Sequence, residues 1–194
     1  MKALRIILWL MVAAAVVGVG AFILRQRSDT PQTSPTQVSF GGSFTLVDSK
    51  GRPFASNQLT GRPYAIFFGF THCPDVCPTT LARLVKLRRQ LGDDRSFQIV
   101  FVTVDPERDG PAEVGSYADL FGAPVIGLTG STAQISQVKK QFGIFSEKVG
   151  TGDTYTVDHT ATVLLFDGQG QFQSTISPDE AEAAALAKLK RIAA

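Results

Sequence analysis

Residues 64–81 read YAIFFGFTHCPDVCPTTL and carry the only two cysteines of the 194-residue chain. The first seven residues of this stretch are continuously apolar, which is typical of a central strand covered on both faces. Cys73 and Cys77 follow directly, and Pro78 is suited to the first turn of a helix that continues to Leu91. The stretch therefore predicts a buried strand that ends at two thiols, which lie where a helix begins.

A strand hairpin precedes this stretch, and strand-like and helix-like segments alternate after it. The predicted strands cover residues 44–47 and 52–54 as a hairpin, then 64–70, 97–104, 125–128, 155–159, 162–166 and 171–176. The predicted helices cover residues 78–91, 111–121, 132–142 and 177–192. This alternation predicts a single α/β domain with a mixed sheet flanked by helices.

The N-terminus is different in composition. Residues 6–24 read IILWLMVAAAVVGVGAFIL, and 19 residues of helix span about 28 Å, close to the thickness of a bilayer core. A cleaved secretory signal is the alternative, but its apolar region is usually shorter. We therefore predict an uncleaved membrane anchor at 1–27, a polar tether at 28–42 and a folded domain at 43–194. Either alternative exports the domain.

The charge distribution argues against a nucleic-acid partner. Of the 19 basic residues, Lys2, Arg5, Arg25 and Arg27 flank the apolar segment, which leaves 15 basic and 17 acidic residues from residue 28 onward. Binding to nucleic acid requires a clustered basic surface. The domain has no such surface in its sequence pattern, and no nucleic-acid partner is predicted.

Cys73 and Cys77 are separated by three residues at a junction between strand and helix. Backbone N–H groups and the helix dipole at such a junction favour the thiolate, which predicts lowered thiol pKa values, nucleophilic sulfurs and good metal ligands. A purely structural disulfide is the alternative, although so short a loop removes little unfolded-state entropy. The pair is therefore predicted to be redox-active and metal-binding.

The two histidines, His72 and His159, are 87 residues apart, and each lies near a feature of interest. The side chain of His72 is expected to point away from that of Cys73, since neighbours along an extended chain face opposite sides. His159 follows a polar, glycine-bearing stretch and is predicted to lie on a loop at the rim of the same sheet. Two thiolates and one imidazole, Cys73, Cys77 and His159, form a soft three-ligand set that favours Cu(I) over zinc or calcium.

Three segments of this chain resemble the Sco/SenC family, whose members have a thioredoxin-like fold. The most specific is GFTHCPDVCPTTL at 69–81, and the others are VTVDPERD at 102–109 and VDHTATVLLFDGQG at 157–170. The resemblance covers residues 43 to about 175 and places the family's copper ligands on Cys73, Cys77 and His159. The single N-terminal anchor also matches the family.

The resemblance implies a copper metallochaperone that delivers Cu(I) or Cu(II) to the binuclear CuA site in the copper-site subunit of cytochrome c oxidase. The alternative is a thiol-disulfide oxidoreductase in which Cys73 and Cys77 keep the copper-ligand cysteines of the oxidase reduced. Whether the chain is an enzyme therefore stays open. Both functions require an upstream exported thiol reductant or copper donor, and both place the domain on the periplasmic or equivalent side of the cytoplasmic membrane.

Acidic residues close to the predicted site have two interpretations. Asp75 and Asp158 are either turn residues at the surface or groups that orient the ligands. The segment 105–109 is either a solvated loop before a helix or part of the surroundings of the site. None of these carboxylates is predicted to be a metal ligand.

Overall fold

The computed structural model describes residues 9, 11, 40–92 and 96–193. The chain divides into two compact units, Met1–Gln37 and Val38–Ala194. Of the first unit only Trp9 and Met11 are described, both helical, so the predicted anchor and nearly all of the tether lie outside the described residues. Among the residues that are described, no helix is long and apolar enough to cross a membrane.

The second unit is built on a seven-stranded mixed sheet with the order β2-β1-β5-β4-β3-β8-β9. Its strands are β1 (Thr45–Asp48), β2 (Pro53–Ala55), β3 (Tyr64–Gly69), β4 (Gln98–Thr103), β5 (Ile126–Thr129), β8 (Val163–Phe166) and β9 (Phe172–Ile176). β3, β4 and β5 are parallel, whereas β8 is antiparallel to β3 and β1 to β5. The predicted mixed sheet and the predicted hairpin β1–β2 are confirmed.

β3 lies at the centre of this sheet, between β4 and β8. All six of its residues and all six of β4 are buried, as the continuous apolar runs predict. The rings of Phe67 and Phe101 lie in register across the parallel pair, and their centroids are 6.5 Å apart. The C-terminal end of β3 is therefore fixed by the core on both sides before the chain reaches the cysteines.

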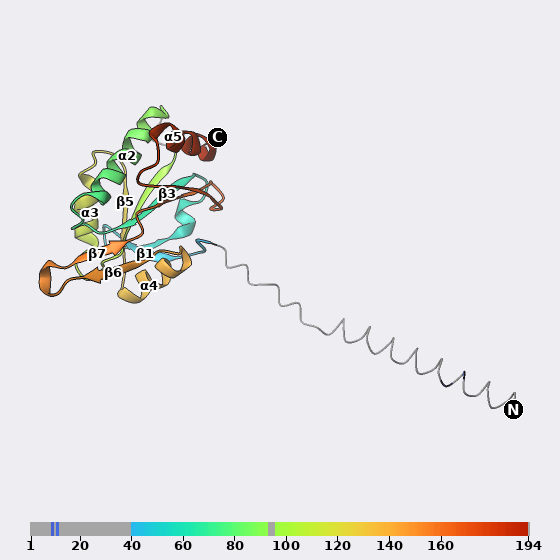
Figure 1. Cartoon of the computed structure of the whole chain (residues 1–194), viewed down its shortest axis with the longest axis horizontal. Coiled ribbons are helices and arrows are strands. Elements are labelled where there is room, and N and C mark those ends of the chain that lie inside the picture. Colours follow the sequence, from blue (N-terminus) through green and yellow to red (C-terminus); the bar gives the residue numbers. More distant parts are fainter. Residues whose placement is uncertain (1–8, 10, 12–39, 93–95, 194) are drawn as a thin grey trace. The chain divides into compact units, whose positions relative to one another are not determined.

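Four helices flank the sheet, and each begins after a loop that turns the chain. They are α2 (Val76–Gln90), α3 (Pro111–Asp119), α4 (Thr132–Gln141) and α5 (Glu182–Ala193), with short 3-10 turns at Ser56–Leu59 and Gly152–Thr154. α2 and α5 lie together, joined by an ion pair of 2.7 Å between Lys86 and Glu182, while α4 lies on the other side of the sheet (Figure 1). α4 is capped by Ser131, which forms a capping box with Gln134.

The last helix begins later than predicted. The sequence pattern places its start at Ser177, but α5 begins at Glu182. The guanidinium group of Arg83 donates to the carbonyl oxygens of Ser177, Pro178 and Glu180, so these groups are engaged by α2. The prediction was wrong because it considered local capping residues and not this tertiary contact.

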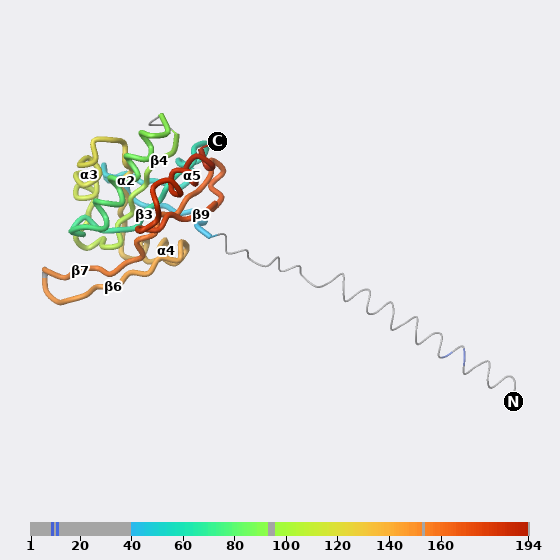
Figure 2. Tube along the Cα trace, turned by 45° about the horizontal axis from the view of Figure 1, so that its top comes forward, coloured from blue at the N-terminus to red at the C-terminus, as the bar shows by residue number. Residues whose placement is uncertain are grey.

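A second, two-stranded sheet was not predicted. β6 (Ser146–Val149) pairs antiparallel with β7 (Thr156–His159), and the two strands run side by side as an arm (Figure 2). Three of the four residues of β6 are exposed, which explains why the segment carries no apolar pattern. The strand predicted at 155–159 is confirmed as β7, but it belongs to this second sheet. His159 is its last residue, so the predicted position of His159 on a loop at the rim of the main sheet is wrong.

Candidate metal centre

The two cysteines lie beyond the C-terminal end of β3, as predicted. Cys73 is partly exposed in the loop, and Cys77 is fully buried as the second residue of α2. Both are free thiols, and the backbone N–H of Cys77 donates to the Sγ atom of Cys73 at 3.4 Å. The helix start therefore positions one sulfur within the core and leaves the other within reach of a second molecule.

Gly69 makes room for the buried sulfur. A Cβ atom at this position would lie 2.7 Å from the Sγ atom of Cys77, 3.0 Å from the Phe67 ring and 3.1 Å from the Phe101 ring. Contacts under 3 Å cannot be tolerated without movement of the backbone or the sulfur. The position of Cys77 thus depends on a glycine that the family-like motif contains but the residue-level reasoning did not single out.

His159 completes the group from the other sheet. Its Nε2 atom lies 3.4 Å from the Sγ atom of Cys77, and the three ligand atoms of Cys73, Cys77 and His159 all lie within 4.8 Å of one another. Two donors bonded to one ion at about 2.3 Å can be at most about 4.6 Å apart. The spacing is therefore that of a three-ligand metal site to within a few tenths of an ångström, and the described residues contain no other such group.

The ring of His159 has a defined tautomer. Its Nδ1 atom lies 3.1 Å from the carbonyl oxygen of Thr160, and a carbonyl oxygen can only accept, so the neutral ring carries its proton on Nδ1. The lone pair on Nε2 then points toward Cys77. Burial lowers the pKa of His159 below its ordinary value of about 6.5, which keeps the imidazole neutral at pH 7. This is the form of histidine that binds metals.

The pKa of the buried Cys77 thiol differs from the predicted direction. Burial raises the pKa of Cys77, and the hydrogen bond with the sulfur of Cys73 adds to the rise. The predicted lowering of the thiol pKa is therefore wrong for Cys77, because loss of water outweighs the helix terminus once the sulfur is within the core. In the metal-free protein the Cys77 thiol keeps its proton and can donate it to Nε2 of His159.

Asp109 holds the loop that leads to the cysteines. Its fully buried carboxylate accepts from the backbone N–H of Thr71 at 2.9 Å, from the Thr71 hydroxyl at 2.5 Å and from the Thr103 hydroxyl at 2.6 Å. Asp105 is also buried. The interpretation of 105–109 as a solvated loop is therefore wrong at both carboxylates, and the segment belongs to the surroundings of the site.

The remaining polar residues near the motif stay at the surface. Asp75 and Asp158 are exposed, and Asp75 accepts a hydrogen bond of 3.2 Å from the Thr79 hydroxyl. His72 is also exposed, with its Nδ1 atom 3.0 Å from the Thr71 hydroxyl, and it is not part of the three-residue group. His72 therefore lies next to Cys73 in sequence without joining the cluster.

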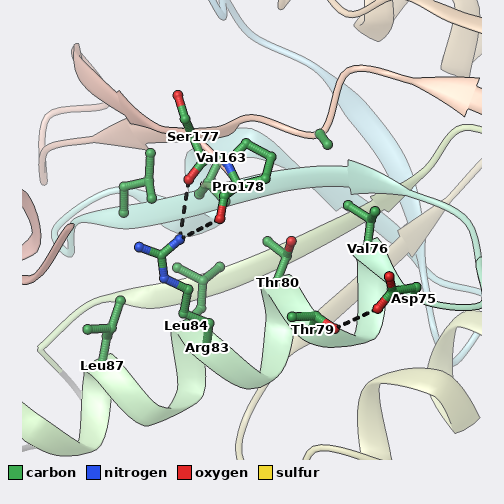
Figure 3. Close-up of a pocket in the computed structure, with 12 residues that line it drawn as sticks. Asp75, Val76, Thr79, Thr80, Arg83, Leu84, Leu87, Val163, Ser177 and Pro178 are labelled. Carbon is green, nitrogen blue, oxygen red and sulfur yellow. Dashed lines mark hydrogen bonds between the residues drawn. The ribbon is translucent and has the colours of Figure 1, made fainter. Parts of the chain in front are cut away.

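An apolar cavity of about 130 Å³ adjoins the cysteine pair along α2 (Figure 3). Val76 lies at one end and Leu84 and Leu87 line the helix side, opposite Val163 of β8. Val76 is 40% exposed although it is apolar. A concave apolar surface thus lies directly beside the peptide that separates the two cysteines.

Comparison with known proteins places this site in a family. The sequence model of the SCO1/SenC family matches residues 32–194. The chain belongs to the SCO1/SenC family. A SCO2-like protein of Rickettsia felis is 34% identical over 175 residues, which cover 84% of this chain and 85% of that protein.

Solved structures of the family share the fold. The structure of Bradyrhizobium japonicum ScoI with copper bound is 41% identical with a TM-score of 0.71, and the match covers 79% of this chain and 99% of that one. Yeast Sco1 with copper bound is 32% identical with a TM-score of 0.71, and the match covers 79% and 87% of the two chains. The predicted thioredoxin-like α/β fold is thereby confirmed for the described domain.

Proposed function

We propose that this protein binds one copper ion through the Sγ atoms of Cys73 and Cys77 and the Nε2 atom of His159. The observation that carries the proposal is the convergence of these three atoms within 4.8 Å, with the histidine lone pair facing a sulfur. Thiolate and imidazole are the donors that copper prefers. The ion would take the place of the proton between Cys77 and His159, so loading releases protons.

The bound copper is cargo that passes to the CuA site in the copper-site subunit of cytochrome c oxidase. Three ligands leave the ion open to a further ligand from the recipient, and the partly exposed Cys73 is the ligand that an incoming group can displace first. The apolar cavity beside Val76 offers a contact surface for that partner next to the site. Membership of the SCO1/SenC family supports this role in oxidase assembly.

The second candidate is a thiol-disulfide oxidoreductase, favoured by the presence of one exposed and one buried free thiol in a thioredoxin-like fold. The Cys73 thiolate would attack a disulfide of the oxidase subunit, forming a mixed disulfide and releasing one substrate thiolate. The Cys77 thiol would then pass its proton to Nε2 of His159 and attack the Cys73 sulfur, which releases the second substrate thiolate and leaves a Cys73–Cys77 disulfide. An exported reductant would have to return the two electrons.

The predicted anchor at 1–27, with its apolar segment at 6–24, would hold the domain at the cytoplasmic membrane, on the periplasmic or equivalent exported side. The tether at 28–42 would reach at most about 50 Å from the bilayer. This side of the membrane is oxidising, so the thiols need continuous reduction there. The location therefore makes the redox state of the cysteine pair a condition for loading.

The test uses the full chain purified in mild detergent, once with a verified Cys73–Cys77 disulfide and once after reduction and removal of the reductant. Copper should bind tightly, one ion per chain, only to the reduced protein, because the same sulfurs cannot form a disulfide and two thiolate ligands. Equal binding in both states would contradict the site.

A peptide that carries the oxidase copper-binding loop as a disulfide separates the two candidates. Reduction of this peptide by the reduced, copper-free protein at a rate well above that of a Cys77→Ser variant would favour the oxidoreductase. Copper transfer to the reduced peptide without such turnover would favour the metallochaperone.

A further inference from the structure

The arm that carries His159 is attached to the body by side chains. β6 and β7 form a sheet of their own, which shares no strand pairing with the seven-stranded sheet among the described residues. The two cysteines, in contrast, follow a strand of the core. The distance between His159 and the sulfurs is therefore set by the short connection from His159 to β8, by Val157 in the core and by the polar side chains that fasten the arm.

Arg108 is the centre of that attachment. Its Nε atom donates to Oδ2 of Asp105 at 2.6 Å, and its Nη1 atom donates to the carbonyl oxygen of Tyr155 at 2.9 Å. The Tyr155 hydroxyl donates to Oδ1 of Asp105 at 2.7 Å, and the guanidinium carbon lies 3.6 Å from the centre of the Tyr155 ring. Asp105, Arg108 and Tyr155 thus form a closed ring of contacts. Tyr155 is the member on the arm, four residues before His159.

The ion pair between Asp105 and Arg108 is more buried than the pair that joins Lys148 of β6 to Glu107. The Asp105 side chain is fully buried and that of Arg108 is 19% exposed, whereas Lys148 and Glu107 are 45% and 56% exposed. Exposed ion pairs contribute little, because water and salt screen them. Asp105 and Arg108 both lie on the loop after β4, and they hold the arm through their hydrogen bonds with Tyr155. Removing Arg108 leaves the buried Asp105 carboxylate without its charged partner and removes the bond to the Tyr155 carbonyl, so it should disturb the arm more than loss of the exposed Lys148–Glu107 pair.

Arg108 also reaches the other half of the site. Its guanidinium carbon lies 5.9 Å from the centre of the Phe70 ring, and the Phe70 ring meets the His159 ring edge-on at 5.8 Å. Phe70 belongs to the loop that carries Cys73. The same side chain therefore contacts the arm at Tyr155 and the aromatic wall against which the imidazole rests.

We propose that Arg108 is a positioning residue that fixes the reach of His159 to the cysteine sulfurs through Asp105 and Tyr155. The proposal rests on the proposed copper site for its effect on affinity, but the placement of His159 is a property of the metal-free protein. Arg108 does not touch the metal. Its whole effect on copper binding therefore passes through the imidazole.

The first test needs no copper. In nuclear Overhauser spectra of the full-length, metal-free chain, contacts between the ring protons of His159 and Phe70 should be present in the wild type and lost in Arg108→Gln. Arg52→Gln is the matched control, because it removes an equally charged side chain from an exposed pair with Asp48. Unchanged contacts in Arg108→Gln would overturn the proposal, whether or not the chain binds copper.

The second test is a double-mutant cycle on copper affinity, measured by competition with a chelator. Arg108→Gln should lower affinity by about 10-fold, the scale on which groups behind a metal ligand act, and should weaken the imidazole nitrogen signal in electron spin echo spectra of the Cu(II) form. In a His159→Ala background the same change should alter affinity less than about twofold, since the imidazole is already absent. Equal losses in both backgrounds would overturn the proposal.

Two further variants keep the test decisive if Arg108→Gln is poorly folded. Arg108→Lys retains the charge but cannot bind Asp105 and Tyr155 in the same fork, so it should lose the ring contact with Phe70 as well. Tyr155→Phe removes only the hydroxyl and should shift the imidazole signal in the same direction by a smaller amount. Wild-type behaviour of both variants would show that the arm is held by other groups.

Discussion

The two halves of the site are held in different ways. Cys77 is fully buried behind a central strand whose residues are all buried, while His159 comes from a two-stranded arm with mostly exposed residues. The Cys77 sulfur therefore shares the stability of the core, and Cys73 lies in the loop that follows the same central strand. The imidazole depends on a few side-chain contacts, which makes the third ligand the adjustable one. The proposed role as a metallochaperone, which binds an ion and later releases it, would gain from this division.

Removal of the buried ligand Cys77 should have the largest effect on copper affinity. Cys77→Ser removes a thiolate ligand and is expected to lower copper affinity more than about 100-fold, beyond the scale of groups that only support ligands. Chelator competition measures the loss, and the sulfur-to-copper absorption should fall with it. Thr79→Ala, at an exposed position of α2 two residues after Cys77, should bind copper as the wild type does. A similar loss in both variants would contradict the assignment of Cys77.

Removal of the ligand on the arm, His159, should lower copper affinity less. His159→Ala is expected to weaken copper binding about 10- to 100-fold while the sulfur-to-copper absorption band remains, since both thiolates stay in place. His72→Ala, at an exposed histidine outside the cluster, should leave both quantities unchanged. If His72→Ala abolished binding and His159→Ala did not, the wrong histidine would have been assigned.

A third variant disturbs the core half without touching a ligand. Gly69→Ala places a methyl group 2.7 Å from the Cys77 sulfur and should lower the free energy of unfolding by about 1 to 3 kcal/mol, the usual cost of overpacking. Gly168→Ala is the matched control, because the nearest atom to its Cβ position is 3.5 Å away. Urea unfolding of the metal-free protein compares the two. Equal stability would mean that the sulfur can move aside freely.

The smallest predicted effect concerns pH. Burial holds the pKa of His159 below 6.5 in the folded protein. At pH values between 6.5 and this folded pKa, the unfolded chain therefore binds more protons than the folded chain. The contribution of His159 to stability is therefore complete above pH 6.5 and is lost as pH falls through its folded pKa. The stability of wild type relative to His159→Gln should decrease over this range. A relative increase on acidification would contradict the burial of a neutral imidazole.

The sequence was most informative where local signals and burial agree. The apolar run at 64–70 and the proline at 78 were sufficient to predict β3 and α2 and to place the cysteines at their junction, although α2 begins two residues earlier than predicted and includes Cys77. β6 was missed because its residues are polar, and its extended conformation depends on pairing with β7. A strand of this kind is determined by its partner and not by its own pattern.

The burial of the carboxylates near the site could not be predicted from composition, for a related reason. Asp109 accepts from Thr71, which is 38 residues away, and Asp105 accepts from Tyr155 at a separation of 50 residues. A charged run with distant partners cannot be told from a solvated loop by composition. The family-like motif at 102–109 was the one signal that could have identified these buried carboxylates.

The most direct measurement of the central claim is X-ray absorption at the copper edge of the loaded, full-length chain. The account predicts two sulfur neighbours at about 2.3 Å and the outer-shell scattering of one imidazole bonded at about 2.0 Å. The imidazole contribution should disappear in His159→Ala while both sulfurs remain. A spectrum with fewer than two sulfur neighbours, or an imidazole contribution that survives in His159→Ala, would contradict a site built from the thiolates of Cys73 and Cys77 and one histidine on the arm.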